Sequence, residues 1–363
     1  MEHFLVCPQC RRELRVALNA VRCETCGTEW SCSEGFFDFM DHSVQNYWGE
    51  IPQPEMLTVI QDAERKGWLA AVQESDLLTS SRKSYIVSPT RAAWWPTVGL
   101  GPGSSVLDVG CGWASIADPL SRVCRVVVGI EPVLERARFA ALRKEQSNLE
   151  NLHILRADLL SAPLVDHYFD VVILNGVVEW LGQDGHPDPG GRQLEGLLKA
   201  KSLLRPGGHI CIGIENRYGI HYALGMKDHC GLPYTSFMPR TIANLITRCL
   251  TRKPYVTLTY SYWGYRELLE RAGFTEIRTF ASLPSYSMPR YLLPLDKDMA
   301  PLQYFAEKQF FPMADPEETN PAHRASQIRW AQLLYWGTRL LGRSPELVRF
   351  LAPFFTISAI RGD

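Results

Sequence analysis

The fold class follows from residues 106–115, which read Val106-Leu107-Asp108-Val109-Gly110-Cys111-Gly112-Trp113-Ala114-Ser115. The first four residues form a short, mostly apolar segment of the kind that becomes a buried β-strand. The two glycines permit a tight turn and let the backbone approach a ligand closely. A strand, a Gly-x-Gly turn and a helix in this order are typical of the nucleotide-binding unit of open α/β sheets.

Two details of the turn narrow the class of ligand. The pattern is Gly-x-Gly-x-x-Ser, so Ser115 stands where the dinucleotide fingerprint has its third glycine. Asp108 lies two residues before the first glycine, and its charge would repel a pyrophosphate. The same charge is no obstacle to S-adenosylmethionine, which has no phosphate and carries an ammonium and a sulfonium group. An NAD-binding domain is the alternative.

Short apolar segments alternate with helical stretches after this turn. Strands are predicted over residues 126–130, 152–155, 169–174 and 209–214, with helices over 133–146 and 192–204. Because helices separate the strands at this spacing, we expect an α/β fold with a doubly wound parallel sheet.

Polar residues stand at the carboxyl ends of these strands, where ligands of open α/β sheets bind. Glu131 is placed to accept hydrogen bonds from ribose hydroxyls, and Asp158 can accept from an adenine amino group. Asn175 ends the fourth strand. The predicted cofactor-binding residues are Asp108, Gly110, Cys111, Gly112, Glu131, Pro132, Ala157, Asp158, Leu159, Asn175 and Gly176.

These residues, in this order, resemble the motifs of the class I S-adenosylmethionine-dependent methyltransferases. Residues 108–112 match the first motif, Glu131 the ribose-binding acid and Asp158 the adenine-binding acid. Asn175 begins the fourth motif, and residues 205–208 match the turn before the fifth strand. The resemblance implies a methyltransferase with S-adenosylmethionine as cofactor.

The same resemblance implies a seven-stranded Rossmann-like sheet that closes with an antiparallel strand. Residues 274–280 are predicted as the sixth strand and residues 355–360 as the seventh. The expected methyltransferase domain spans residues 96–363, with insertions at about 216–258 and 285–352.

Four of the ten cysteines form two Cys-x2-Cys pairs near the start of the chain. The pairs are Cys7 with Cys10 and Cys23 with Cys26. Two such pairs inside thirty residues are typical of a closed, tetrahedral, structural zinc site. The alternatives are that the two pairs occur by chance or that the cysteines form disulfides.

With Trp30 and residues 35–39, this segment resembles the Trm112-type zinc ribbon, which occurs alone or fused to methyltransferases. The resemblance covers about residues 1–40 and implies a structural role for zinc, or a role in docking a protein partner. Residues 41–95 are expected to form a mainly helical connector.

Four polar residues near the carboxyl edge are candidates for a catalytic general base: Glu179, Glu215, His221 and His229. Each has an ordinary alternative. Glu179 could pair locally, Glu215 could anchor Arg217, and the histidines could be plain loop residues. A metal site of Glu179, His221 and His229 is a further alternative, although this spacing is not a signature.

The two insertions differ in character. Residues 236–290 hold eight Lys or Arg and three acidic residues, a net charge of +5 that suits an anionic substrate. A solvated helical surface is the alternative. The second insertion is expected to be mostly helical, and its apolar, aromatic stretch over residues 328–341 is expected to pack against the catalytic domain. A lipid contact is the alternative for that stretch.

These observations predict methyl transfer to an oxygen or nitrogen of a small-molecule or carrier-bound metabolite. The ribbon together with residues 214–219 resembles a bacterial and archaeal methyltransferase subfamily associated with natural-product and cell-surface glycan pathways. RNA methylation is the enzymatic alternative, but residues 1–40 carry a net charge of −2 and the whole chain −1, which disfavours nucleic acid. A non-catalytic, S-adenosylmethionine-binding scaffold is the third hypothesis.

The location follows from what the sequence lacks. No apolar run approaches the roughly 20 residues of a membrane span. Residues 1–4 have no basic segment and no long apolar stretch of the kind that begins a signal peptide. The remaining cysteines are scattered in mostly apolar settings, as in buried thiols. We therefore expect a cytoplasmic protein.

Overall fold

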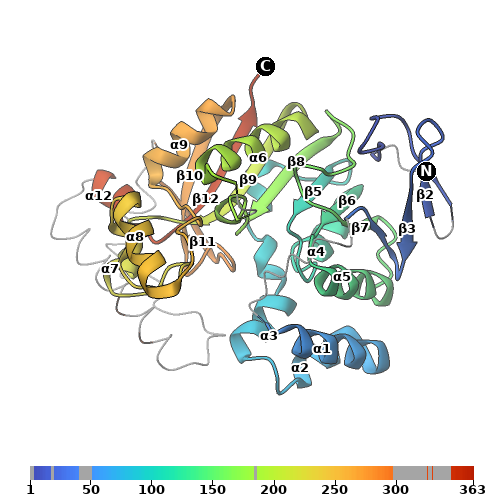
Figure 1. Ribbon diagram of the computed structural model, residues 1–363, viewed down its shortest axis with the longest axis horizontal. Coiled ribbons are helices and arrows are strands. Elements are labelled where there is room, and N and C mark those ends of the chain that lie inside the picture. Colours follow the sequence, from blue (N-terminus) through green and yellow to red (C-terminus); the bar gives the residue numbers. More distant parts are fainter. Residues whose placement is uncertain are drawn as a thin grey trace. The chain divides into compact units, whose positions relative to one another are not determined.

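The computed structural model describes residues 4–17, 20–40, 51–183, 186–296, 325, 329 and 345–363 (Figure 1). The chain divides into two compact units. The first comprises Met1–Ile173 and Ser202–His209, and the second comprises Leu174–Lys201 and Ile210–Asp363.

The first unit is built on parallel strands that are buried on both faces. These are β5 (Ser105–Val109), β6 (Val126–Ile130) and β7 (Leu152–Arg156), in the order β7-β6-β5. Helix α4 (Ala117–Ser121) follows β5, and α5 (Leu134–Gln146) follows β6. Strand β8 (Phe169–Asn175) lies next to β5 over its first residues. The predicted strands and the doubly wound α/β class are confirmed.

The N-terminal ribbon continues this sheet. Its strands are β1 (Arg15–Val16), β2 (Ala20–Arg22), β3 (Glu29–Ser33) and β4 (Phe36–Asp38). They pair antiparallel in sequence order, and β4 then pairs parallel with β7. The expected count of seven strands is therefore too low. The physical reason is that β7 would otherwise be an edge strand, and β4 satisfies its outer backbone groups.

The connector is helical where the structure describes it. It contains α1 (Gln53–Lys66), α2 (Trp68–Glu74), α3 (Ser80–Val87) and the 3-10 turns η1 (Pro89–Ala92) and η2 (Trp95–Val98). Apolar residues of these helices, such as Met56 and Ile86, share one core cluster with Trp113 and Phe139. The connector therefore packs on the helical layer that follows β5 and β6.

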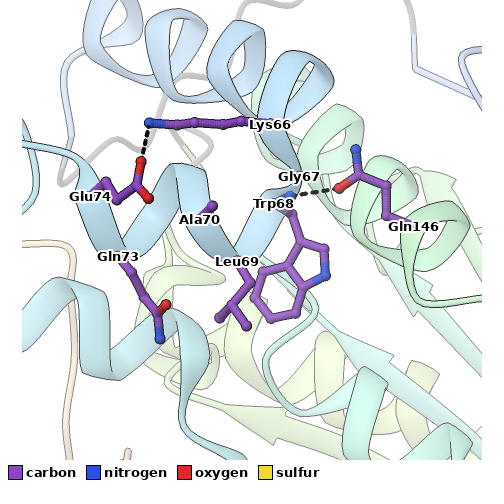
Figure 2. Close-up of a pocket in the computed structure, with 8 residues that line it drawn as sticks. All are labelled: Lys66, Gly67, Trp68, Leu69, Ala70, Gln73, Glu74 and Gln146. Carbon is purple, nitrogen blue, oxygen red and sulfur yellow. Dashed lines mark hydrogen bonds and ion pairs between the residues drawn. The ribbon is translucent and has the colours of Figure 1, made fainter.

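A shallow pocket lies on this connector (Figure 2). Its lining includes Trp68, whose backbone N–H donates to Gln146 Oε1, and the Lys66–Glu74 ion pair (Figure 2). The Trp68 ring packs under the Arg143 guanidinium, 4.0 Å from the ring centroid. None of the predicted site residues lines this pocket. The Lys66–Glu74 pair joins α1 to α2, and the Trp68–Gln146 hydrogen bond joins α2 to α5.

The second unit carries the antiparallel part of the fold. Strand β10 (Phe274–Leu283) pairs antiparallel with β12 (Phe354–Arg361) on one side and with β11 (Tyr291–Pro294) on the other. The order in this unit is β9-β12-β10-β11, where β9 spans Leu204–Glu215. The predicted sixth and seventh strands are confirmed.

Helices and short 3-10 turns lie between these strands along the chain. They are α6 (Pro189–Leu203), the turn η3 (Val178–Trp180), α7 (Ile220–Ala223), the turn η4 (Thr235–Phe237), α8 (Arg240–Thr251), α9 (Tyr262–Arg271) and α12 (Pro345–Leu351). The second insertion was expected to be mostly helical, but near its beginning residues Tyr291–Pro294 form the strand β11. The hydrogen bonds of β11 complete the outer edge of β10, which explains the strand. The predicted apolar stretch over 328–341 falls outside the described residues, except for helical Arg329. Within the described part of the chain, none of the helices combines the length and apolarity needed to cross a bilayer.

Candidate functional site

The glycine turn of the first unit has the backbone that its sequence requires. Gly110 and Gly112 adopt φ values of 64° and 55°, in the left-handed region that favours glycine. The Cys111 amide donates to the Ile130 carbonyl at 3.1 Å, so the turn is tied to the end of β6. The turn is therefore held in place next to the strand that carries Glu131.

Glu131 is buried and supports this turn. Its carboxylate accepts from the Gly112 amide through Oε2 and from the Val133 amide through Oε1, each at 2.9 Å. Burial raises the pKa of Glu131, and these two amides and nearby Arg136 oppose the rise. Each oxygen keeps a second lone pair, so the carboxylate can also accept from a ligand hydroxyl.

Asp108, in β5, has a buried carboxylate oxygen, Oδ2, without a hydrogen-bond partner among the described residues. The residue is 2% exposed. Burial raises its pKa to about 7, with Glu131 adding to the rise and Arg91 opposing it. A buried carboxylate of this kind is stabilised by a cationic ligand, which fits the ammonium group of S-adenosylmethionine. Sequence reasoning did not identify Arg91.

Asp158 follows β7, and its Oδ1 accepts from the Leu160 amide at 2.9 Å. Because β5, β6 and β7 are parallel and in register, their carboxyl ends meet at one edge. The structure thus brings the Asp108 turn and Glu131 into contact and places Asp158, between Ala157 and Leu159, at the end of the neighbouring strand.

Two further predicted cofactor residues, Asn175 and Gly176, belong to the second unit. The Gly176 amide donates to the Gly213 carbonyl at 2.8 Å, and its φ is 70°. A Cβ at Gly176 would meet the Tyr286 hydroxyl at 3.0 Å, so this turn has no room for a side chain. The Asn175 Oδ1 is buried without a hydrogen-bond partner in the described ranges.

The second unit also gathers three of the four candidate catalytic residues. His229 Nε2 lies 3.3 Å from Glu215 Oε2 and 3.9 Å from Glu179 Oε1. One ligating atom from each of the three residues lies within 4.8 Å of the others. Glu179 is fully buried. We call Glu179, Glu215 and His229 the acidic–histidine cluster.

The elements that carry the cluster are distant in sequence. Glu179 lies in η3, Glu215 ends β9, and His229 lies in the loop between α7 and η4. The Trp180 ring packs edge-on against the His229 ring with centroids 4.9 Å apart. The Tyr265 hydroxyl donates to the Glu215 carbonyl at 3.1 Å. Sequence reasoning missed both aromatic neighbours, because nothing in their spacing points to the cluster.

The three titratable side chains of the cluster shift one another's pKa values. Burial and the charge of Glu215 raise the pKa of Glu179 to about 8, although His229 opposes the rise. Burial also acts to raise the pKa of Glu215, but the adjacent His229 outweighs it and the pKa falls below its usual value. Burial acts to lower the pKa of His229, and Glu215 outweighs it, so this pKa rises to about 9. The cluster therefore retains positive charge or protons at neutral pH.

His221 is not part of the cluster. It is 2% exposed, its ring stacks on Phe354 with centroids 4.8 Å apart, and burial lowers its pKa to about 4. His221 is therefore neutral at pH 7. The hypothesis of a metal site formed by Glu179, His221 and His229 is wrong in its membership, because Glu215 stands where His221 was expected. The reason is that α7 turns the His221 ring into the apolar core.

The four paired cysteines of the ribbon converge in the first unit. Their Sγ atoms approach one another at 3.6 Å for Cys7 and Cys26 and at 3.4 Å for Cys10 and Cys23, and all four cysteines are free thiols. Zinc bound to four sulfurs at about 2.3 Å holds them about 3.8 Å apart, so the spacing is compatible with zinc. The disulfide alternative is not realised.

In a comparison with known protein families, residues 107–212 match the family model described as a methyltransferase domain. The mitochondrial ubiquinone biosynthesis O-methyltransferase of Mus musculus is 31% identical over 128 residues, covering 34% of this chain and 32% of that protein. The ubiquinone biosynthesis O-methyltransferase of Acinetobacter baumannii (strain ACICU) is 27% identical over 202 residues, covering 50% of this chain and 81% of that protein.

Among solved structures, phosphoethanolamine N-methyltransferase 2 of Haemonchus contortus in complex with S-adenosyl-L-methionine has a TM-score of 0.43 and 12% identity. That match covers 84% of this chain and 60% of the other. The chain spans about a third of the length of the mammalian relatives that it matches. Together with the strand order and the glycine turn, the family match confirms the resemblance to the class I, S-adenosylmethionine-dependent methyltransferases over residues 107–212, which carry a methyltransferase domain.

Proposed function

We propose that this protein transfers a methyl group from S-adenosylmethionine to an oxygen of a small-molecule or carrier-bound metabolite. The observation that carries the proposal is the largely buried acidic–histidine cluster in a chain with a methyltransferase domain. The printed names of the curated relatives, which are O-methyltransferases, support oxygen as the accepting atom. The resemblance of residues 214–219 to enzymes of natural-product and cell-surface glycan pathways supports a biosynthetic metabolite.

In the first unit, the cofactor would be held by three acidic groups. Asp108 would pair with the cationic methionine portion, since its Oδ2 is buried and lacks a partner in the described structure. Glu131 would accept from the ribose while it supports the glycine turn, and Asp158 would accept from adenine. The cofactor supplies an activated methyl group on sulfonium, so the protein mainly has to position the two reactants.

The hydroxyl group that accepts the methyl group has to give up its proton during the reaction. A hydroxyl reacts well with a sulfonium methyl group only after it loses its proton or shares it with a base. The acidic–histidine cluster provides two carboxylates and an imidazole from three separate elements, which can receive or redirect that proton. A purely structural ion pair would need only two of these groups.

In the ribbon, Cys7, Cys10, Cys23 and Cys26 would bind one structural Zn²⁺. The strands of the ribbon are two to five residues long, too short to bury a core alone, so the metal would supply much of their folding free energy. This role for zinc is structural, since four thiolates leave no open position for a substrate.

The test is a transfer assay with methyl-labelled S-adenosylmethionine and acceptors that carry phenolic, enolic or sugar hydroxyls. The expected result is label in a hydroxyl-bearing small molecule, with a loss of at least about 100-fold in Glu215→Gln. The matched control is Glu195→Gln, an exposed carboxylate paired with Arg192 on α6, which should keep full activity. Label found solely in RNA, or equal rates for both variants, would contradict the proposal.

A further inference from the structure

We propose that Glu179, Glu215 and His229 bind one divalent metal ion of the first transition row, such as Zn²⁺ or Mn²⁺. The role given to this ion in catalysis rests on the proposed function, whereas its binding does not. The argument uses residues of the second unit alone.

The first step is geometric. The measured separations are 3.3 Å between His229 Nε2 and Glu215 Oε2, and 3.9 Å between His229 Nε2 and Glu179 Oε1. Adjacent nitrogen and oxygen ligands at about 2.1 Å from one ion lie about 3.0–3.5 Å apart. The first separation is already in this range, and the Glu179 and Glu215 ligand oxygens lie within 4.8 Å of each other. The three ligand atoms therefore need to draw together by roughly an ångström to share an ion.

The second step concerns unsatisfied groups. Both carboxylate oxygens of Glu179 are buried and have no hydrogen-bond partner within the described chain, and the same holds for Glu215 Oε2 and His229 Nε2. His229 Nε2 approaches Glu215 Oε2 at 3.3 Å, an ion-pair distance. A buried carboxylate is strongly unfavourable unless it is neutralised or paired with a cation. A cation bound among these atoms would supply the partner that each of them lacks within the described chain.

The third step concerns rigidity. Asp228, next to His229, fixes the loop: its Oδ1 accepts from the Cys230 amide, and its Oδ2 accepts from the Thr235 and Tyr255 hydroxyls. Trp180 holds the imidazole from the side. Metal ligands are usually oriented by surrounding groups in this way, since a loose ligand loses affinity.

The donor set determines the kind of metal. Two carboxylates and one imidazole suit Zn²⁺, Mn²⁺ or Fe²⁺, whereas the four thiolates of the ribbon select zinc. Three protein ligands leave coordination positions open, as in catalytic metal sites. With the ion bound, the three side chains would act as ligands and not as proton acceptors, and an acceptor hydroxyl bound to the ion would release its proton to water more readily. In the proposed reaction, a lone pair of that oxygen would form the new O–CH3 bond while the methyl–sulfur bond breaks, and the electron pair of the broken bond would stay on sulfur in S-adenosylhomocysteine.

The experiment counts zinc in the full-length protein after saturation with Zn²⁺ and removal of free metal. Wild type should hold two Zn²⁺ per chain, Glu215→Gln and Glu179→Gln one, and Cys7→Ser one. Glu195→Gln, an exposed carboxylate outside the cluster, should hold two. Mn²⁺ binds poorly to thiolates and provides a second probe. Spin-resonance titration of wild type that carries a single Zn²⁺ per chain, in the ribbon, should show one Mn²⁺ site, weakened at least tenfold in Glu215→Gln.

The variants must be folded, which circular dichroism verifies. If Glu179→Gln does not fold, the wild-type count and Glu215→Gln still decide. One Zn²⁺ in wild type with no Mn²⁺ site, or unchanged binding in Glu215→Gln, would overturn the proposal. Methyl transfer that persists after complete removal of cluster metal would refute the catalytic role and leave the proposed function standing. Metal binding without methyl transfer to any acceptor would refute the proposed function and leave the site standing.

Discussion

The Arg156 guanidinium lies 2.9 Å from the Asp38 carboxylate, and each of the two side chains is more than nine-tenths buried. Asp38 ends the last ribbon strand, β4, and Arg156 ends the sheet strand β7, to which β4 is paired. The Arg156 Nε also donates to the Pro132 carbonyl at 3.3 Å, in the segment that follows Glu131. The ion pair therefore links the ribbon to the strand ends that carry the predicted cofactor residues.

This pair gives the first prediction. Asp38→Ala should lower the free energy of unfolding by about 3–5 kcal/mol, because it leaves a buried guanidinium without its counter-charge. Chemical denaturation monitored by circular dichroism measures the change. The control is Glu24→Ala, which removes the exposed ion pair with Arg15 and should cost less than about 1 kcal/mol. Equal effects of the two substitutions would show that β4 is not anchored through Asp38.

The second prediction concerns pH and cofactor affinity. In the free protein the pKa of Asp108 is about 7, raised by burial and by Glu131 and lowered by Arg91. A cationic ligand binds the ionised carboxylate, so binding at low pH must first release a proton. The affinity for S-adenosylmethionine should therefore rise with pH, and between pH 6 and pH 8 the increase should be about tenfold.

Calorimetric titration at several pH values measures this dependence. Asp108→Asn should bind more weakly at pH 8 and show a flat profile, since the titrating group is gone. A wild-type affinity that is constant from pH 6 to pH 8, or that falls with pH, would remove Asp108 from the proposed cofactor site.

The cofactor side of the first unit was predictable from sequence for a physical reason. Asp108 lies near the end of the short strand β5, Glu131 and Asp158 follow β6 and β7, and parallel strands place their carboxyl ends together. The ribbon cysteines were equally visible, because two residues between thiols confine both to one ion. In both cases local spacing determines the position of the functional group.

The acidic–histidine cluster was predictable only in part. Glu179 and Glu215 follow strands, but the choice between His221 and His229 depends on how the intervening loop folds. The loop turns His221 onto Phe354 and holds His229 beside the two glutamates through the hydrogen bonds of Asp228. These are contacts between residues distant in sequence, and they have no local pattern. The pairing of β4 with β7 was missed for the same reason, since a three-residue strand gives almost no sequence signal.

The last prediction concerns the packing beneath the glycine turn. Gly129 lies in β6 opposite Asp108 of β5, and a Cβ there would meet Cys111 Sγ at 2.8 Å and Ile154 Cδ1 at 3.2 Å. Gly129→Ala should therefore displace the turn, lower the free energy of unfolding by about 1–3 kcal/mol and weaken cofactor binding. Gly103→Ala is the matched control, because a Cβ at Gly103 meets nothing within 4 Å. The double variant Gly129→Ala/Cys111→Ala removes the nearest clashing sulfur, so it should recover part of both losses in a double-mutant cycle. Additive losses would mean that Gly129 acts through its strand rather than through the turn.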